Sequence, residues 1–218
     1  MAGGEQAEVG WREGIVPVSL RFDDPYFSLA GGLAEAGHVF LAGNDLPGRF
    51  CDGFQVAELG FGTGLNLLAL VLASGGAAVR FISFEAYPMA VADMARALAA
   101  FPQVQAEGLL QAWGAGRRRF DLGRVEVEVI VGDARETLPS WEGKADAWFL
   151  DGFSPAKNPE LWSDGLMDQV GRHTAAGGTC ATYTAAGHVR RALAAAGFEV
   201  ARVAGHGTKR HMTRGRMA

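Results

Sequence analysis

Phe54-Gln-Val-Ala-Glu-Leu-Gly-Phe-Gly-Thr-Gly-Leu-Asn66 is the stretch around which the chain is organised. Residues 55–59 read as a short buried strand, and helical periodicity begins at Leu65, after three closely spaced glycines. Glycine lets the backbone turn sharply and brings amide N–H groups close to a ligand, because it has no Cβ. The helix that follows begins with its positive end toward that ligand. The stretch therefore predicts a binding turn between a strand and a helix.

The spacing of the glycines narrows the choice of ligand. Gly60, Gly62 and Gly64 follow a G-x-G-x-G pattern, whereas dinucleotide-binding turns have G-x-G-x-x-G, which disfavours NAD. Glu58 lies two positions before the first glycine, and Glu85 ends the next predicted strand. These acids suit a ligand with a cationic amino acid part and a ribose diol, such as S-adenosylmethionine. A tight glycine turn inside any α/β protein explains the loop equally well when the loop is taken alone.

Length and composition are those of one ordinary globular domain. The chain has 218 residues, of which 49% are hydrophobic and 20% charged, enough to bury a substantial core. Its two cysteines, Cys51 and Cys180, show neither metal-ligand spacing nor a disulfide framework, so we predict no metal site and expect a reducing cytosol. The N-terminus lacks an apolar signal core, and no run reaches the length of a membrane span. We therefore expect a soluble, cytoplasmic protein with no membrane partner.

Charge is distributed unevenly along the chain. The formal net charge is −4, which is not the basic footprint that nucleic-acid-binding proteins normally show. Basic residues nevertheless gather at 117–119 and again after Glu199, where no further acid occurs. The second group contains Arg202, Lys209, Arg210, Arg214 and Arg216. Either group can be a solvated face or a contact for phosphates, and charge alone favours the solvated face.

From Phe54 onward, predicted strands alternate with predicted helices, which is typical of a parallel, doubly wound sheet. We predict an α/β fold in which residues 51–218 form a Rossmann-like domain with a seven-stranded sheet. The expected strands are 55–59, 79–85, 125–131, 145–150, 178–184, 198–203 and 209–214. The expected helices are 65–74, 88–100, 134–141, 161–173 and 186–196, and residues 103–124 are an insertion that is partly helical at 109–113.

Residues 1–50 are predicted to be an N-terminal extension that is rich in β-structure. Two short strands are expected within 7–21, around Glu13-Gly14, followed by a helical turn at 31–35 and a strand at 38–41. The segment is too apolar for a linker. We therefore expect it to pack on the core domain as a lid.

Acidic residues follow four successive strands of the predicted sheet. They are Glu58, Glu85, Asp133 and Asp151, and they are expected to share one pocket because ligands bind outside the carboxyl ends of parallel strands. Each acid alone can instead cap the helix that follows it. Together they describe a cofactor pocket. We assign Glu85 to the ribose hydroxyls, Asp133 and the Ala134 backbone to the adenine edge, and the methionyl part to Glu58 with Gly60, Phe61, Gly62, Thr63 and Gly64.

The loop after the fourth strand carries the residues expected to act in catalysis. Asp151-Gly-Phe-Ser-Pro-Ala-Lys-Asn-Pro159 contains two prolines and a glycine, which force an ordered loop. Transfer of a methyl group from a sulfonium needs a neutral nitrogen whose lone pair is aimed at the methyl carbon. Asp151, beside the cofactor, can take the proton of an acceptor amine, and Phe153 can wall the pocket or stack on a base. Lys157 and Asn158 can hold a phosphate or fix the loop; an Asx-capped loop with a core phenylalanine is the alternative.

Several motifs together resemble one known family. They are Tyr26-Phe-Ser28, Val39-Phe-Leu-Ala-Gly-Asn44, the glycine stretch 58–66, Phe81-Ile-Ser-Phe-Glu85, the stretch 146–159 and Gly177-Gly-Thr-Cys-Ala-Thr-Tyr-Thr184. Over about residues 8–215, the chain is similar to the methyltransferase module of the bacterial tRNA-modifying MnmC family, which also occurs as the stand-alone form MnmD. The Asp-Gly-Phe-x-Pro-Ala-Lys-Asn-Pro run is highly specific.

The resemblance implies a class I methyltransferase that uses S-adenosylmethionine to N-methylate 5-aminomethyl(-2-thio)uridine at the tRNA wobble position, giving the 5-methylaminomethyl derivative. It also implies two partners: tRNA, through the anticodon stem-loop, and an FAD-dependent oxidoreductase module, fused or separate. No second glycine fingerprint follows Met217, so we expect a stand-alone enzyme or one domain of a bifunctional protein, without FAD activity of its own. The implied substrate-binding residues are Tyr26, Phe27, Asn44, Phe153, Lys157, Lys209 and Arg210.

One departure and two other enzyme hypotheses accompany this resemblance. The tail loop reads Gly-His-Gly-Thr-Lys-Arg-His over residues 205–211 and lacks a second aromatic residue after the glycine, which weakens a substrate role for that loop. The alternatives are a small-molecule amine methyltransferase and an aminopropyltransferase that uses decarboxylated S-adenosylmethionine. A tRNA-binding protein with a vestigial pocket is disfavoured by the intact loop after Asp151.

Overall fold

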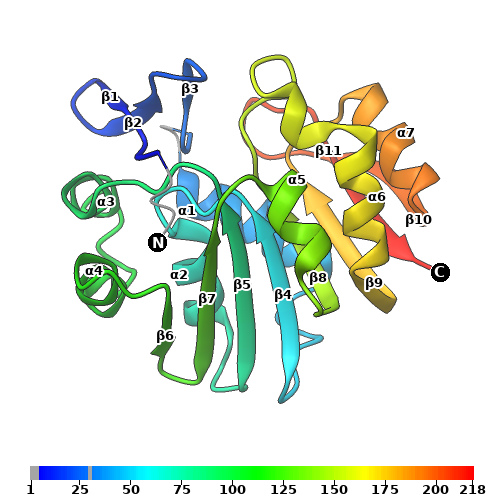
Figure 1. The fold of residues 1–218 in the computed structure, drawn as a ribbon, viewed down its shortest axis with the longest axis horizontal. Coiled ribbons are helices and arrows are strands. Elements are labelled where there is room, and N and C mark those ends of the chain that lie inside the picture. Colours follow the sequence, from blue (N-terminus) through cyan, green and yellow to red (C-terminus); the bar gives the residue numbers. More distant parts are fainter. Residues whose placement is uncertain (1–4, 29–30) are drawn as a thin grey trace.

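The computed structural model describes residues 5–28 and 31–218, and its centre is a mixed sheet with helices on both faces (Figure 1). β11 and β6 run antiparallel to their neighbours, and the four pairings among the central strands are parallel. The predicted doubly wound α/β architecture is therefore confirmed. The spatial order is β10 (Phe198–Ala204), β11 (His211–Met217), β9 (Thr174–Thr182), β8 (Ala145–Leu150), β4 (Phe54–Leu59), β5 (Val79–Glu85), β7 (Val125–Val131) and β6 (Arg119–Leu122).

Apolar side chains that alternate along the central strands build one core on each face of the sheet. Phe81 and Phe149 lie in the first core, while their chain neighbours Ile82 and Trp148 lie in the second, and all four are at most 2% exposed. The first core is covered by α2 (Leu65–Ala73), α3 (Val91–Leu98) and α4 (Glu107–Gly114). The second is covered by α5 (Ala134–Thr137), α6 (Asp164–Arg172) and α7 (Gly187–Ala195). Both faces are thus occupied, which leaves the edge where the parallel strands end as the place for a site.

The sheet has eight strands, one more than predicted. The insertion at 103–124 contains α4, as expected, and also β6, which pairs antiparallel with β7 through a tight turn at Gly123, where φ is +61°. The β6 sequence Arg-Phe-Asp-Leu alternates over only four residues, too few for periodicity to reveal a strand. Other boundaries differ by a few residues: α3 begins at Val91 instead of Pro88, and β11 covers 211–217 instead of 209–214.

The N-terminal segment forms a small sheet of its own. It consists of β1 (Val9–Arg12), β2 (Val16–Ser19) and β3 (Asp24–Pro25), so the hairpin predicted around Glu13-Gly14 is confirmed. Figure 1 shows this sheet on the side of the molecule where the parallel strands end. The helical turn predicted at 31–35 is present as α1 (Gly32–Ala36).

The strand predicted at 38–41 is wrong. The chain continues from α1 as a π-helical turn, η1 (Gly37–Leu41), and then as a 3-10 turn, η2 (Ala42–Asn44). Val39, Phe40 and Leu41 are buried in the first core. A short apolar run of this kind does not by itself distinguish a strand from a buried helix, and packing decided for the helix.

Two kinds of feature are absent from the described residues. Between residues 5 and 28 and from 31 to 218, no helix is both long and apolar enough to cross a membrane. Within the same ranges, no group of three or more His, Cys, Asp and Glu side chains is arranged to hold a metal ion.

Candidate active site

The carboxyl ends of the parallel strands and the N-terminal segment surround a cavity of about 670 Å³. Glu58, Gly64, Asn44, Lys157 and Arg210, all predicted to be site residues, do not line it. The structure therefore gathers most of the predicted cofactor residues but separates three of the predicted substrate residues from the rest. The predicted residues that line the cavity are Tyr26, Phe27, Gly60, Phe61, Gly62, Thr63, Glu85, Asp133, Ala134, Asp151, Phe153 and Lys209.

The glycine turn between β4 and α2 forms one wall of the cavity. Gly60 has a φ of +91°, and a Cβ there would collide with the carbonyl oxygen of Asp151, so only glycine lets the two loops pass this closely. The N–H of Gly62 points at Glu85 and donates to its Oε2 at 2.8 Å. Gly64 has another role than the one predicted: a Cβ there would lie 2.7 Å from Leu109 Cδ2, so this glycine allows α4 to pack on the turn.

Glu85 ends β5 and faces the glycine turn. Its Oε1 accepts the N–H of Tyr87 at 2.7 Å, its Oε2 accepts the N–H of Gly62, and the residue is 8% exposed. Burial raises the pKa of Glu85 above its ordinary value, against the opposing effect of these N–H groups. Each oxygen keeps a further lone pair, so the side chain can accept two hydroxyl groups from a ligand.

Asp133 caps α5 and borders the cavity beside Ala134. Its Oδ1 accepts the N–H of Arg135 at 2.8 Å, and its carboxylate pairs with the Arg135 guanidinium. These hydrogen bonds hold the pKa of Asp133 below its ordinary range. Because Asp133 and Ala134 both line the cavity, helix capping and a place in the cavity wall coexist at this position.

A buried asparagine that the sequence analysis missed joins two of the acids. Asn66 lies in the first turn of α2, and its Nδ2 donates to Glu58 Oε1 at 2.9 Å and to Asp151 Oδ2 at 2.7 Å. The hydroxyl of Ser83 donates to Glu58 Oε2 at 2.6 Å. The signal that could have revealed Asn66 is its place in α2, where every other residue is apolar.

Glu58 lies beneath the cavity and not in its wall, contrary to the prediction. It is 1% exposed, and its two oxygens are held by Asn66 and Ser83. The sequence shows that an acid lies near the end of the strand, but not which face of the sheet its side chain occupies. In the structure the Glu58 side chain lies in the interior, at 1% exposed. Asn66 therefore connects Glu58 to Asp151, which lines the cavity.

Burial controls the electrostatics of this network. Among the described residues, Glu58 has no ion-pair partner, and burial raises the pKa of Glu58 to about 8. Burial likewise raises the pKa of Asp151 to about 7, while the hydrogen bond from Asn66 and the charge of Lys209 lower it. Glu58 thus keeps its proton near neutral pH. Asp151 titrates close to neutrality, where a carboxyl group can exchange a proton with an amine.

Aromatic rings line the side of the cavity formed by the N-terminal segment. The ring of Phe153 stacks on Phe22 with centroids 4.9 Å apart, and Tyr26 meets Phe153 edge-on at 5.0 Å. The indole N–H of Trp162 donates to the carbonyl oxygen of Phe153 at 2.7 Å, which fixes the loop after β8. Phe27 packs against the first core and also borders the cavity. Phe22 was missed, because a single aromatic residue in a loop has no pattern to reveal it.

Lys157 ties the loop after β8 to the N-terminal segment. Its Nζ lies 3.1 Å from Asp23 Oδ2 and 3.8 Å from Asp24 Oδ1, and it also donates to the carbonyl oxygen of Asp23. The N–H of Ser154 donates to Asp24 Oδ2 at 2.8 Å. Of the two roles predicted for Lys157, these contacts support fixing the loop and not holding a phosphate, since two carboxylates already face its charge.

The basic residues predicted in the tail loop have different surroundings. The side chain of Lys209 borders the cavity, with Nζ 2.7 Å from Glu35 Oε1. Arg210 is exposed and lies outside the cavity. In the cluster at 117–119, Arg119 forms an ion pair with an acid of β7. Position in the sequence groups these cations, but only Lys209 belongs to the cavity.

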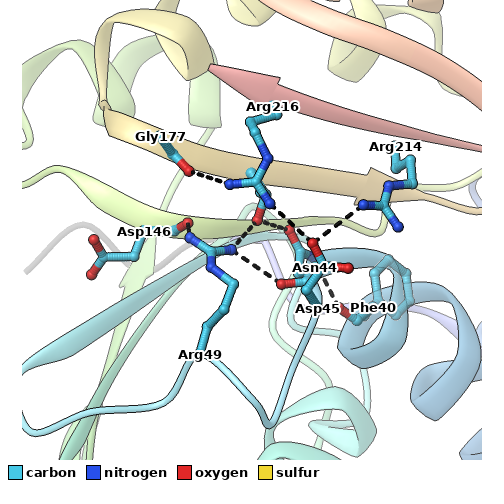
Figure 2. Close-up of polar contacts among 9 residues, drawn as sticks. Phe40, Asn44, Asp45, Arg49, Asp146, Gly177, Arg214 and Arg216 are labelled. Carbon is cyan, nitrogen blue, oxygen red and sulfur yellow. Dashed lines mark hydrogen bonds and ion pairs between the residues drawn. The ribbon is translucent and has the colours of Figure 1, made fainter. Parts of the chain in front are cut away.

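Asn44 was predicted to bind substrate, and the structure places it in a buried network instead (Figure 2). It is 0% exposed, and its Nδ2 donates to the carbonyl oxygens of Phe40 at 2.9 Å and Trp148 at 3.2 Å. Its Oδ1 accepts the hydroxyl of Thr179 at 2.6 Å. Both amide hydrogens are thus used inside the protein, because the chain after η1 turns the side chain toward β8 and β9 and away from the cavity.

Charged residues complete the network around Asn44. Arg49 donates to Thr179 Oγ1 at 2.6 Å and to the carbonyl oxygens of Asn44 at 3.1 Å and Asp146 at 3.0 Å. Figure 2 also shows the guanidinium groups of Arg214 and Arg216 at Asp45, at 3.2 and 3.0 Å. These two tail arginines lie on strand β11 and pair with Asp45, within the fold.

Comparisons with known proteins agree with this geometry. Curated relatives include the tRNA 5-methylaminomethyl-2-thiouridine biosynthesis bifunctional proteins MnmC of Stutzerimonas stutzeri, 46% identical over 98% of this chain, and of Chromobacterium violaceum, 44% identical over 97%. The chain spans only 35% and 34% of the length of those two proteins. The crystal structure of MNMC2 from Aquifex aeolicus superposes with a TM-score of 0.73 at 27% identity, covering 99% of this chain and 70% of that one.

The fold and the family follow from two further matches. TrmN from Thermus thermophilus superposes with a TM-score of 0.53 at 17% identity over 81% of this chain and 47% of that one, a likeness of fold alone. With the match to MNMC2, the predicted class I methyltransferase fold is confirmed. Residues 97–218, more than half of the chain, match a family described as S-adenosyl-L-methionine-dependent methyltransferase. The chain belongs to this family of S-adenosyl-L-methionine-dependent methyltransferases.

Proposed function

We propose that this chain transfers a methyl group from S-adenosylmethionine to the primary amine of 5-aminomethyl(-2-thio)uridine at the wobble position of tRNA, giving 5-methylaminomethyl(-2-thio)uridine. The observation that carries the proposal is that Asp151, whose pKa burial raises to about 7, lines the same cavity as a cluster of aromatic rings. The names of the curated relatives support the tRNA product.

The residues of the cavity fit the cofactor of the family. Glu85 keeps one free lone pair on each oxygen for the two ribose hydroxyls, and Asp133 with the Ala134 backbone lies at the place proposed for the adenine edge. The turn from Gly60 to Thr63 leaves room for the methionyl part, because side chains larger than hydrogen are missing at its two glycines. When bound, S-adenosylmethionine supplies an electrophilic methyl group.

Asp151 prepares the acceptor nitrogen. An alkylamine enters as an ammonium, and its nitrogen has no lone pair until a proton leaves. Asp151 Oδ can accept that proton, because its own pKa lies close to neutrality and Asn66 holds the carboxylate in place. Once neutral, the amine can stay hydrogen-bonded to Asp151, so positioning and proton removal are done by one side chain.

The aromatic cluster formed by Phe22, Tyr26 and Phe153 suits a flipped base. A base stacks on aromatic side chains when it leaves the helical stack, and the Phe153 ring is already fixed by its neighbours. We assign Phe153 and Tyr26 to the uracil ring, and Phe27 to the floor behind them. We also propose residues 1–50 as a lid over the domain of residues 51–218.

We infer two macromolecular partners. The anticodon stem-loop of tRNA would bind at the mouth of the cavity, and the exposed Arg210, next in sequence to the cavity-lining Lys209, would contact a phosphate. An FAD-dependent oxidoreductase module, fused or separate, is the second, because the curated relatives are named bifunctional and are almost three times as long as the matched region.

The test uses S-adenosylmethionine labelled in the methyl group and total tRNA from a strain that is blocked at the aminomethyl stage. We expect label in that tRNA, in a nucleoside that releases 5-methylaminomethyl(-2-thio)uridine on digestion, and none in tRNA that lacks the aminomethyl group. Label in polyamines or free amines, with none in tRNA, would overturn the proposal in favour of a small-molecule methyltransferase. Transfer of an aminopropyl group from decarboxylated S-adenosylmethionine would overturn it in favour of an aminopropyltransferase.

A further inference from the structure

A lysine of the chain itself occupies part of the acceptor side of the cavity. The ammonium of Lys209, in the loop between β10 and β11, lies 2.7 Å from Glu35 Oε1 on α1. The same nitrogen is 3.9 Å from the centre of the Tyr183 ring, just beyond β9. All three side chains border the cavity. A carboxylate and an aromatic face are the two groups that best hold a primary ammonium in a protein.

This ammonium lies close to Asp151. The hydroxyl of Tyr183 donates to the carbonyl oxygen of Gly152 at 2.7 Å, so this side chain reaches the backbone of the residue that follows Asp151. The charge of Lys209 lowers the pKa of Asp151 and that of Glu35 raises it, which places both charges within electrostatic reach of the carboxyl group. An ammonium held by Glu35 and Tyr183 is therefore near the proposed proton acceptor.

The two partners of the ion pair differ in depth. The side chain of Glu35 is 12% exposed, whereas that of Lys209 is 41% exposed. The carboxylate is thus built into the wall of the cavity, and the lysine reaches it from the solvent side. A carboxylate this buried is stabilised by a cation, and the loop that carries Lys209 supplies one.

We propose that Glu35 and the Tyr183 ring form the binding subsite for the ammonium of the acceptor, and that Lys209 fills this subsite until the acceptor displaces it. The proposal rests on the proposed function, in which the acceptor is a primary amine. Exchange of one ammonium for another keeps Glu35 paired, whereas a nucleoside without an amine would displace Lys209 and leave the carboxylate alone. Glu35 and Tyr183 therefore select for an acceptor that carries a cationic amine. Asp151 then removes one proton from the selected group.

The experiment measures how strongly the protein prefers tRNA with the aminomethyl group over the same tRNA with unmodified uridine. Both dissociation constants are determined without S-adenosylmethionine, so that no transfer occurs. The variants are Glu35→Gln, Lys209→Met and Tyr183→Leu. Asp168→Asn is the matched control, because it removes the acid of an ion pair with Arg172 on α6 that has no part in the cavity. The preference is the dissociation constant for unmodified tRNA divided by that for aminomethyl tRNA. This ratio cancels any phosphate contact that Lys209 makes with both tRNAs.

Glu35→Gln should lower the ratio by about tenfold, the worth of one charge-assisted hydrogen bond. Tyr183→Leu should lower it by about threefold, in line with an exposed cation–π contact. Lys209→Met should keep the ratio or raise it, because a competitor for Glu35 is gone, and Asp168→Asn should leave it unchanged. A drop with Lys209→Met as large as that with Glu35→Gln would overturn the proposal, since the pair would then be a structural link between α1 and the loop. Unaltered calorimetric binding of S-adenosylmethionine verifies that each variant is folded.

Failure of the proposed subsite and failure of the proposed function give different results. A protein that prefers aminomethyl tRNA through Glu35 but transfers no methyl group would keep the subsite and refute the function. A protein that methylates this tRNA with a ratio near one would keep the function and refute the subsite.

Discussion

Two buried asparagines hold together two polar networks that differ in kind. Asn44 donates to two backbone carbonyls, and the cationic side chain of Arg49 lies beside it (Figure 2). Asn66 donates to two carboxyl groups, those of Glu58 and Asp151. Both residues are almost wholly buried, at 0% and 7% exposed. The same type of side chain therefore bonds only to groups inside the fold in one place, and joins two acids beside a cavity in the other.

The two networks differ in the charged groups around the asparagine. Around Asn44 the side-chain amide and the Thr179 hydroxyl have partners inside the protein, and Arg214 and Arg216 both pair with Asp45, so the network fixes the chain after η1. Around Asn66 two acids share one amide, and burial raises the pKa of both. A protein tolerates such an arrangement at the expense of stability, and perturbed groups of this kind concentrate at functional sites. We expect the first network to respond to mutation in stability and the second in activity.

Removing the carboxylate of the second network should have the strongest effect. Asp151→Asn keeps the shape of the side chain but cannot accept the proton, so kcat should fall by about 100-fold or more. The dissociation constant of S-adenosylmethionine should stay within about threefold. Single-turnover methyl transfer and calorimetric titration measure the two quantities. A comparable loss of cofactor binding would instead place Asp151 among the groups that hold the cofactor.

Alanine at each asparagine tests the comparison directly. Asn44→Ala should lower the free energy of unfolding by about 3 kcal/mol, since it breaks three buried hydrogen bonds, while kcat of the folded protein stays within about twofold. Asn66→Ala should cost less stability but lower kcat by about tenfold, because Asp151 loses its orientation. It should also shift the acid limb of the pH–rate profile to higher pH, because the Asn66 hydrogen bond lowers the pKa of Asp151. Urea unfolding measures the free energy of unfolding, and the pH–rate profile measures the shift of the acid limb. An acid limb at the same pH in Asn66→Ala would mean that Asn66 has only a structural role.

The stability of the protein should fall as pH rises from about 5 to 8, by up to about 6 kcal/mol from the two raised carboxyl pKa values of this network. The pKa of Glu58 in the folded state, about 8, lies above its ordinary value, as does that of Asp151 at about 7. The folded state therefore binds protons more tightly than the unfolded state within this window, and their loss destabilises it. Glu58→Gln should remove about half of this dependence, because Asp151 still titrates, and should leave S-adenosylmethionine binding unaltered.

Thermal unfolding between pH 5 and pH 8 measures this slope, with Asp168→Asn as the surface control. A slope as steep in Glu58→Gln as in the unmodified protein would show that Glu58 is not protonated in the folded state. Weaker binding of S-adenosylmethionine by the same variant would instead support the predicted contact between Glu58 and the methionyl part.

The weakest effect is expected at the arginines near the end of the chain. Both Arg210 and Arg216 are exposed, but Arg216 forms an ion pair with Asp45, whereas Arg210, in the loop that carries Lys209, has no ion pair among the residues that the structure describes. Arg210→Ala should weaken tRNA binding by about threefold and reduce its salt slope by about one, as expected for one phosphate contact. Arg216→Ala should leave tRNA binding unchanged. Filter binding at several salt concentrations distinguishes them, and equal effects would make the whole basic tail a tRNA surface.

Local patterns in the sequence are enough to predict the order of strands and helices, the glycine turn and the acids that end the parallel strands. These features depend on periodicity and on residues that are near one another in the chain, so the sequence alone assigns Gly60, Glu85 and Asp151 to one edge of the sheet. The short β6 was missed, and the segment that forms η1 was wrongly predicted as a strand, because four or five residues give too little periodicity.

Which polar side chains meet depends on the tertiary structure. Asn66 and Asp151 are 85 positions apart, Asn44 and Thr179 are 135 apart, and Glu35 and Lys209 are 174 apart. The sequence shows that such residues can form hydrogen bonds or ion pairs, but not their partners, since packing of the two cores sets the direction in which each side chain leaves its strand or helix. That is the physical reason why Asn44 was predicted at the substrate and Glu58 at the cofactor, while Asn66 and Glu35 were missed.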